Sequence, residues 1–512
     1  MTKLIRTKPK IFRFCALVLL LRVGFFCGNT VEARENHPTV LMVVIDGLRP
    51  DYISPELMPN LDALGQSGVV AQRHHSVFPS VTRVNASSIA TGSYPAAHGI
   101  LQNTIFLPAV SSNPIDTADA TALLEVETKT SGHLLTAPSL GELMEKKGKR
   151  LFVAGSSSTG ASLLLNHKLK GDGIWNSRGL VKPGENQARA EKLLGSFPGE
   201  SKPSRKGNRW AIQAVLENVG NEASADVIIL WLTDPDGVEH GSGVGSPETL
   251  EAVRHVDAEV GYLLNGLKAR GLKDKINIFV TTDHGFSSYT GGVNLQTLLS
   301  DRGQNGGINI VSNQIHVKNR DEEKIKTIVR VLQETVLVGA IFTRAEKPGS
   351  AHGFVSGTLS FDLIHWNHDR AADILVDSDW TDQTNAFGYR GTTANNGIAG
   401  HGTSSPFDLN IRLIASGPDF KRGLRSDVPT GNIDLAPTIL HLLGIKAPQS
   451  MNGRILKELL RNGPSPDKVE VKEIVERAAH NQEGKTYEVG LKKLVVGDTD
   501  YIDFAKVHRK NP

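Results

Sequence analysis

The chain has 512 residues, of which 39% are hydrophobic and 22% charged, values that are ordinary for a soluble globular protein. The net charge of +3 is spread along the chain, and this gives no support to a nucleic-acid-binding surface. The length exceeds what one small core can fill, so a large α/β domain with an inserted or appended unit is expected.

The first 33 residues have the pattern of a secretion signal peptide. A basic start precedes the apolar run 14–26, which is interrupted by Arg22 and is short for a membrane span. We therefore expect an exported protein, periplasmic or secreted, with no stable membrane span after cleavage; an uncleaved anchor is the alternative. Cys15 and Cys27 both lie in this leader. The mature chain would then have no disulfide, no thiol nucleophile and no thiolate metal ligand.

Short apolar runs alternate with helical patterns along the rest of the chain, which predicts strands of a mostly parallel sheet covered by helices. The predicted strands are 40–45, 150–154, 227–232, 276–282 and 409–415. The predicted helices are 55–68, 139–147, 210–219, 247–267 and 434–443.

The order of these elements predicts a core interrupted by an insertion. The core would comprise residues 34–286 and 401–462, and residues 287–400 would form an inserted cap subdomain with a helix at 321–336 and apolar runs such as 373–376. The alternative is that the insertion only extends the sheet. Residues 463–512 form a polar C-terminal extension, in which 487–504 is expected to make an edge hairpin.

Asp and His residues gather where the predicted strands end, and ligands of α/β proteins bind beyond the carboxyl ends of parallel strands. Taken singly, a strand-end Asp is most often a turn former, and a lone His is more often structural than a ligand. Together they have the composition of a two-metal site with nitrogen and oxygen ligands. The residues concerned are Asp46, Asp236, His240, Asp283, His284 and His401.

The spacing of Asp236 and His240 places both on one face of a helical turn, which favours Asp236 over the competing Asp234 as a ligand. His401 lies between two glycines, which let the backbone pass close to a metal or substrate.

Thr82 follows a Pro- and Ser-containing loop, 78–81, and precedes a predicted helix. Its alternative role is to cap that helix, as Ser80 also could. A metal ion can lower the pKa of a threonine hydroxyl and make it a nucleophile for displacement at phosphorus.

Six segments in chain order closely resemble the nucleotide pyrophosphatase/phosphodiesterase family of the alkaline phosphatase superfamily, over residues 38 to 455. They are VVIDGLRPD (43–51), FPSVT (78–82), TGSYPAAHGI (91–100), DPDGVEH (234–240), TDHG (282–285) and GHG (400–402). The resemblance implies an alkaline-phosphatase-like three-layer α/β sandwich with a central, mostly parallel sheet.

The resemblance also implies two zinc ions. Asp236, His240 and His401 would hold one ion. The second would be held by Asp46, Asp283 and His284, with Thr82 as fourth ligand and nucleophile. Asn103 would contact a phosphoryl oxygen, with Asn85 as the weaker candidate, while His98 would be structural.

The implied activity is hydrolysis of phosphodiester or nucleotide pyrophosphate bonds in a small phosphorylated substrate, through a phospho-threonine intermediate. Nucleotide-binding members of the family often have an aromatic residue after the nucleophile, where this chain has Arg83. A guanidinium there suits pairing with a second anionic group of the substrate. The alternative is that Arg83 points away from the site and ties down its loop through a carboxylate. The alternatives are a phosphonoacetate-hydrolase-like enzyme that cleaves a C–P bond, a phosphomonoesterase on the same site, and a non-catalytic binding module.

Overall fold

The computed structural model describes residues 1–2, 40–219 and 224–510, so the predicted leader lies almost entirely outside the described residues. Residues 36–512 form one compact unit. Within the described part of the chain, no helix is both long enough and apolar enough to cross a bilayer.

A ten-stranded sheet forms the centre of the molecule, in the order β20-β2-β19-β9-β1-β8-β5-β6-β7, with β21 paired to β2. Strand β1 runs parallel to both β8 and β9, and β5 runs parallel to β8 and β6. The strands are β1 (Val40–Ile45), β2 (Val69–His75), β5 (Leu151–Gly155), β6 (Gly173–Asn176), β7 (Leu180–Lys182), β8 (Val227–Leu232), β9 (Asn277–Thr281), β19 (Asn410–Ser416), β20 (Leu424–Ser426) and β21 (Thr430–Gly431).

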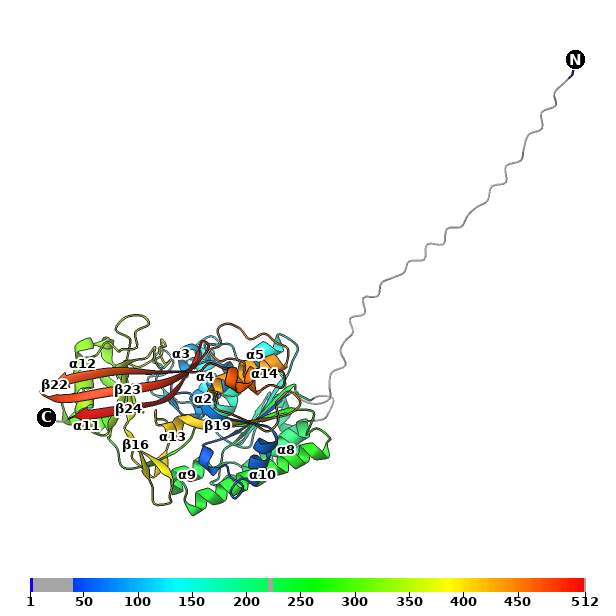
Figure 1. Ribbon diagram of the computed structural model, residues 1–512, viewed down its shortest axis with the longest axis horizontal. Helices are drawn as coiled ribbons and strands as arrows, with labels where there is room; N and C mark the ends of the chain where they lie inside the picture. The colour runs from blue at the N-terminus through cyan, green and yellow to red at the C-terminus, as the bar shows by residue number, and fades with distance from the viewer. Residues whose placement is uncertain (3–39, 220–223, 511–512) are drawn as a thin grey trace. The chain divides into compact units, whose positions relative to one another are not determined.

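Both faces of this sheet are buried, as expected for parallel strands covered by helices. In β1, Val40, Met42 and Val44 join one hydrophobic cluster, and the alternate residues 41, 43 and 45 join the other. Figure 1 shows α8 and α10 together on one side of the sheet and α2, α4 and α14 on the other. The chain thus has the alkaline-phosphatase-like three-layer α/β fold. The helices of these layers are α1 (Pro59–Ser67), α2 (Thr82–Thr91), α3 (Pro95–His98), α4 (Ala120–Lys129), α5 (Leu140–Glu145), α6 (Thr159–Leu165), α7 (Gln187–Leu194), α8 (Arg205–Asn218), α9 (Asp236–Ser242), α10 (Pro247–Ala269), α13 (Pro406–Leu409) and α14 (Leu435–Leu442).

The predicted helices are present, with shifted boundaries. Helix α1 begins at Pro59 rather than at residue 55, because a turn precedes it and proline is favoured at a first helical position. Helix α5 begins after Ser139, which forms a capping box with Glu142. Helix α8 begins at Arg205, five residues before the predicted start. The prediction missed its first turn because the residues of that turn are polar.

The fourth site-forming strand differs from the expectation of a parallel sheet. Strand β19 runs antiparallel to both β9 and β2. Its first residues therefore lie at the edge where β1, β8 and β9 end. This direction explains why His401 precedes its strand in sequence, whereas Asp46 and Asp283 follow theirs.

Residues 287–400 contribute two smaller sheets. One has the order β11-β12-β15-β13-β14, and the other has the order β16-β17-β10-β18. Their elements are β10 (Ser287–Tyr289), α11 (Leu295–Asp301), β11 (Ile308–Val311), β12 (Gln314–Val317), α12 (Glu322–Glu334), β13 (Val338–Thr343), β14 (Leu359–Ser360), β15 (Ile374–Ser378), β16 (Trp380–Thr384), β17 (Arg390–Thr393) and β18 (Ala399–Gly400). A two-stranded sheet of β3 (Thr104–Ile105) and β4 (Ile115–Asp116) lies outside this segment.

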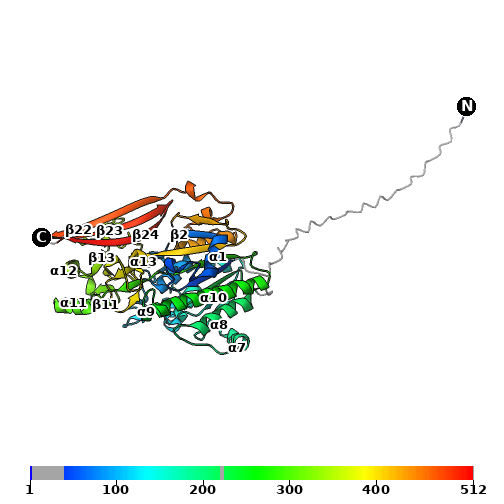
Figure 2. The same cartoon turned by 60° about the horizontal axis from the view of Figure 1, so that its bottom comes forward.

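The C-terminal residues form a separate three-stranded sheet and not an edge hairpin of the central sheet. It consists of β22 (Lys472–Gln482), β23 (Lys485–Val496) and β24 (Thr499–Lys510). Figure 2 shows these long strands lying beside β13, and Tyr487, Val489 and Leu491 share a hydrophobic cluster with residues of that strand. The predicted hairpin corresponds to β23 and β24. The charged first strand was missed because most of its residues are exposed and, within the strand, only Ala478 is buried.

Candidate metal centre and active site

Four separate parts of the chain deliver the predicted site residues to one edge of the central sheet. Asp46 directly follows β1, and Asp283 and His284 follow β9. Helix α9 begins at Asp236, shortly after β8, and carries His240 one turn later. His401 directly follows β18. The sheet thus gathers residues that lie more than 350 positions apart in the sequence.

Each buried carboxylate of this cluster has an oxygen that lacks a hydrogen-bond partner. Asp46 Oδ2 accepts hydrogen bonds from Ser157 Oγ and Trp231 Nε1, both 2.9 Å away, whereas its Oδ1 accepts none. Asp283 Oδ1 accepts the Gly47 N–H at 3.2 Å, whereas its Oδ2 accepts none. Asp236 Oδ1 is likewise buried and unsatisfied. Unsatisfied buried acceptors are costly, so their convergence fits a site that holds cations.

The three histidines are oriented by backbone carbonyls. The Nδ1 atoms of His240, His284 and His401 lie 3.1, 3.0 and 2.8 Å from the carbonyl oxygens of Ala399, Gly285 and Ser80, respectively. A carbonyl oxygen only accepts, so Nδ1 carries the proton and Nε2 presents a lone pair. This is the usual second interaction of a metal-ligating histidine.

The Nε2 atoms face the unsatisfied carboxylate oxygens in two overlapping groups. We call Asp46, Asp283 and His284 the inner group, and Asp236, His240 and His401 the outer group. In the inner group, His284 Nε2 lies 3.1 Å from Asp283 Oδ2 and 3.6 Å from Asp46 Oδ1. In the outer group, Asp236 Oδ1 lies 3.4 Å from the Nε2 atoms of both His240 and His401.

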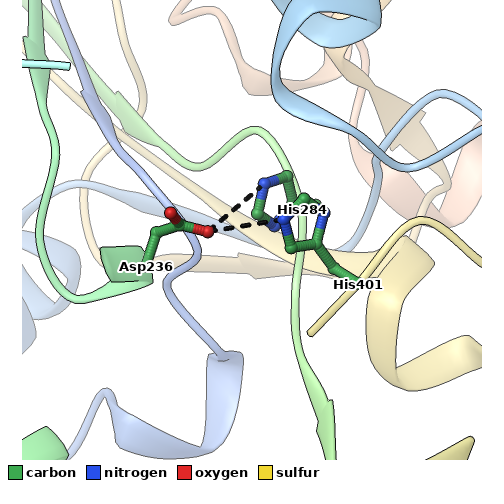
Figure 3. Close-up of side chains that lie close together, drawn as sticks. All are labelled: Asp236, His284 and His401. Atoms are coloured by element: carbon green, nitrogen blue, oxygen red, sulfur yellow. Dashed lines mark ion pairs between the residues drawn. The ribbon is translucent and has the colours of Figure 1, made fainter. Parts of the chain in front are cut away.

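These separations fit metal coordination. A tetrahedral ion with bonds of about 2.0–2.1 Å places its ligand atoms about 3.3 Å apart. Ligand atoms of Asp46, Asp283 and His284 all lie within 4.8 Å of one another, and so do those of Asp236, His284 and His401. Figure 3 shows the rings of His284 and His401 stacked beside the Asp236 carboxylate. His284 Nε2 lies 4.0 Å from Asp236 Oδ1, farther than from either inner carboxylate.

The electrostatics of the cluster also favour bound cations. Burial, together with the neighbouring carboxylates Asp283 and Asp236, raises the pKa of Asp46 well above its ordinary value. Burial and Asp236 raise the pKa of Asp283 to about 6. Burial also raises the pKa of Asp236, but the neighbouring imidazoles of His240 and His401 outweigh burial and lower that pKa. A bound dication would stabilise all three carboxylates in their charged form.

Thr82 is the first residue of α2 and lies against the inner group. Its Oγ1 is 3.3 Å from His284 Nε2. The residue before it, Val81, makes no side-chain capping bond, so first-turn N–H groups other than that of Arg83 are left to bind an anion. A helix N-terminus favours an anion.

Asn103 and Arg83 lie at this same helix end. Asn103 Oδ1 accepts the backbone N–H of Arg83 at 3.1 Å. This bond fixes the amide so that its Nδ2 is the group left to donate. The Arg83 residue is half-buried, and its Nε is buried without a hydrogen-bond partner. Among the described residues, no carboxylate forms an ion pair with it.

Three other residues considered from the sequence have structural roles. The Asn85 amide bonds to both the N–H and the carbonyl of Val77, and so ties down the loop before Thr82. His98 Nδ1 accepts the Ile100 N–H, and its Nε2 lies 3.0 Å from Ser88 Oγ. Asp234 accepts hydrogen bonds from Ser204 and Asn208, which direct it away from the cluster.

The glycine before His401 has a reason other than the expected approach to a metal. A Cβ atom at Gly400 would lie 1.9 Å from the Tyr289 hydroxyl, so the backbone passes close to a side chain of β10. Gly402 has a φ of +112°, a conformation that favours glycine.

Several supporting residues escaped sequence reasoning. Trp231 and Ser157 hold Asp46, and Ser76 Oγ donates to the carbonyl of Asp283. Asn432 Nδ2 donates to the carbonyl of Thr282, which precedes that aspartate. Asp408 Oδ2 accepts hydrogen bonds from both the N–H and the hydroxyl of Thr403, in the loop that carries His401. Trp231 alone had a visible signal, because it lies near the end of a site-forming strand.

Comparison with known proteins identifies the family. The sequence profile of the type I phosphodiesterase / nucleotide pyrophosphatase family matches residues 40–390. Ectonucleotide pyrophosphatase/phosphodiesterase family member 7 of Mus musculus is 24% identical over 461 residues, covering 85% of this chain and 90% of that protein. The bis(5'-adenosyl)-triphosphatase ENPP4 of Bos taurus is 23% identical over 447 residues, covering 85% of both chains.

The fold is similar to solved structures as well. Murine ectonucleotide pyrophosphatase / phosphodiesterase 5 superposes with a TM-score of 0.61 at 18% identity, covering 82% of this chain and 100% of that one. Fold and cluster together define a phosphoric ester hydrolase with an alkaline-phosphatase-like core. The chain belongs to the type I phosphodiesterase / nucleotide pyrophosphatase family.

Proposed function

We propose that this protein is a two-zinc hydrolase that cleaves phosphodiester or nucleotide pyrophosphate bonds, with Thr82 as nucleophile. The observation that supports this most is the pairing of three unsatisfied buried carboxylate oxygens with three Nε2 lone pairs beside the Thr82 hydroxyl. The inner group, with Thr82, would hold one ion and the outer group the other. Zinc fits because the ligands mix imidazole nitrogen with carboxylate oxygen and include no thiolate.

When bound, the two ions would polarise the phosphoryl group and lower the pKa of the Thr82 hydroxyl. Thr82 Oγ1 attacks phosphorus, a new O–P bond forms, and the bond to the leaving-group oxygen breaks. Water then attacks the phospho-threonine, which releases the phosphorylated product and returns the Thr82 hydroxyl. Asn103 Nδ2 and the free N–H groups of α2 donate to the non-bridging oxygens, whose charge rises in the transition state.

Arg83 defines the preferred substrate in this proposal. Its Nε is buried without a partner, and Asp46, Asp116, Asp236 and Asp283 all act to raise its pKa against the stronger effect of burial, which lowers it. Its guanidinium is therefore close to the acidic cluster without being paired to it. A buried Nε–H without an acceptor is costly, and an anionic oxygen of the substrate could accept its hydrogen bond. The substrate should carry a second negative group, such as another phosphate or a carboxylate.

Residues 287–400 are proposed to act as a cap over this substrate. Gln102 donates a side-chain hydrogen bond to Asn313, and Gln314 donates one to the carbonyl of Thr104. These bonds connect β12 and the turn before it to the segment that contains Asn103. Residues 287–400 also lead directly into His401. The placement of the cap would therefore affect both the oxyanion donor Asn103 and the outer group.

Zinc analysis and activity measured on the same preparation test the proposal. The purified protein should contain about two zinc ions per chain, one in each group. Each ion would keep an open coordination position for substrate. It should hydrolyse a chromogenic phosphodiester faster than a phosphomonoester or phosphonoacetate. Prolonged chelation should abolish the activity and zinc should restore it. Full activity without metal would refute the proposal, and two bound ions without any hydrolysis would indicate a binding protein.

A further inference from the structure

The edge of the central sheet opposite the metal centre is strongly basic. Strands β1, β5, β8 and β9 are parallel, so the loops that enter them share one edge, and antiparallel β19 ends there. Three segments at this edge, 145–150, 268–275 and 419–422, contain ten Lys and Arg residues and three acids. We call the ten cations the basic edge: Lys146, Lys147, Lys149, Arg150, Lys268, Arg270, Lys273, Lys275, Lys421 and Arg422.

This concentration contrasts with the charge of the rest of the chain. The first 35 residues hold seven of the cations and two of the acids, so residues 36–512 carry a net charge of −2. The folded part is thus slightly acidic as a whole, yet one edge of it is basic. The charges that look evenly distributed along the sequence are brought together by the topology of the sheet.

The cations from different loops lie close together. Lys268 and Lys273, after α10, line the same surface hollow as Lys421 and Arg422, after β19. On the other side of β1, Lys149 Nζ lies 3.3 Å from Asp226 Oδ1, and the carbonyl of Asp226 accepts the N–H of Val40. The basic edge therefore extends around the point where the chain enters its first strand.

At least half of these cations are available to a partner. Lys146, Lys147, Lys268, Lys273 and Arg422 are exposed. Within the described residues, no carboxylate forms an ion pair with any of these five side chains. Lys149 and Arg150, in contrast, pair with Asp226 and Asp172.

The basic edge is far from the metal centre. Helix α10 has 23 residues, begins beside α9 in the outer part of the metal centre, and ends at the basic edge. At 1.5 Å per residue it spans about 35 Å. A partner bound at the basic edge would therefore leave the metal centre open to solution.

We propose that the basic edge binds the surface of an anionic phospholipid membrane. Val40 follows the predicted leader in the sequence, so this edge is where the fold is connected to the segment expected to insert into the membrane during export. Clustered cations at the end of such a segment bind anionic headgroups. The edge keeps its charge when the leader is removed, and so would hold the mature enzyme at the membrane surface with its site facing away.

Vesicle binding tests this surface with a matched control. In the test variant, Lys268, Lys273, Lys275 and Arg422 are all changed to Glu. In the control variant, four exposed cations far from this edge, Arg330, Lys347, Lys485 and Lys510, are changed to Glu. Both variants have the same net charge, and both should keep wild-type activity on a soluble chromogenic diester, which shows that they fold.

The exported protein and both variants, each with the same N-terminus, would be sedimented with phosphatidylcholine vesicles that contain or lack phosphatidylglycerol. Wild type and control should bind only the anionic vesicles, and added salt should release them. The test variant should bind at least about tenfold more weakly. Equal binding of all three proteins, salt-resistant binding, or binding to a duplex DNA as tight as to the anionic vesicles would overturn the proposal.

Discussion

The inner and outer groups of the metal centre use similar side chains but are built differently. The side chains of Asp46, Asp283 and His284 are 2%, 0% and 0% exposed, and they follow the central strands β1 and β9 directly. The side chains of Asp236, His240 and His401 are 20%, 41% and 6% exposed, and they come from the short helix α9 and the loop after β18. The sheet itself thus fixes the inner group, whereas peripheral segments hold the outer group.

The difference in burial and support gives the inner and outer groups different roles in the reaction. A rigid inner group suits the positioning of a nucleophile, because small displacements of reacting atoms are costly. Solvent-accessible ligands in the outer group leave room for substrate and water. If this division is right, changes near the inner group should act on chemistry, and changes around the outer group should act first on metal occupancy.

Removal of the nucleophile should have the largest effect. Thr82→Ala should lower turnover on the order of 10⁴-fold or more, because the attacking oxygen is lost. Zinc content should stay close to that of wild type, since the three inner side chains remain. Thr82→Ser keeps the oxygen and should retain measurable turnover. Trapping the phosphoryl group on a peptide that lacks Thr82 would contradict the assignment.

Removal of the oxyanion donor should be the next largest effect. Asn103→Ala should reduce kcat by about 10²–10³-fold, the loss typical of one donor to a developing negative charge. KM should change little, since the bond strengthens only in the transition state. Asn85→Ala is a useful comparison, because Asn85 ties down the loop before Thr82 and should lower thermal stability as well as rate.

Arg83→Phe should change specificity more than catalysis. For a substrate with a second anionic group, kcat/KM should fall about tenfold to a hundredfold, the value of a charged hydrogen-bonded pair. A nitrophenyl diester with a neutral tail should be hydrolysed nearly as well as by wild type. Equal losses on both substrates, or no loss on either, would show that Arg83 does not contact the second group.

The support of the inner group can be tested with two tryptophans. Trp231→Phe removes the donor to Asp46 and should weaken the affinity for the inner ion about 10–100-fold, as for other residues that orient a metal ligand. Trp175→Phe is the control, because Trp175 is equally buried but its Nε1 has no partner. Metal competition with a chromogenic chelator measures both. Equal weakening by the two changes would indicate a packing effect.

Acidification should weaken zinc binding by both groups, because protons compete for Asp46 and Asp283 in the inner group and for His240 in the outer group. The pKa of His240 is raised, because its bonds to Asp236 outweigh burial, so protons compete at His240 from above its ordinary value of 6.5. Asp283 takes up its proton only as the pH falls through about 6. Each displaced proton should cost about tenfold in zinc affinity per pH unit. Zinc titrations across this range should show both affinities falling as the pH is lowered, and affinities that stay constant would contradict this prediction.

The sequence predicted the site more completely than it predicted the architecture around it. Asp46 and Asp283 follow long apolar runs that form strands wherever they are buried, so their position at a sheet edge followed from local pattern. The direction of β19 did not, because an apolar run has the same pattern whether its strand is parallel or antiparallel. The roles of Ser157 and Asn432 depend on contacts with residues more than 100 positions away, which one sequence does not show.

The basic edge also could not be predicted from the sequence alone. Lys146, Lys273 and Arg422 belong to three unremarkable surface loops in the sequence. Only the parallel order of the strands, and the reversed direction of β19, brings them to one edge.

Anomalous diffraction at the zinc absorption edge, from a crystal of the protein grown with zinc, tests the central claim most directly. Two peaks are expected, one between Asp46, Asp283 and His284 and within reach of Thr82 Oγ1, and the other between Asp236, His240 and His401. Their separation should be about 3.5–4 Å, as in other two-metal hydrolases. A single peak shared by all six side chains, or zinc bound only elsewhere, would contradict the division into an inner and an outer site.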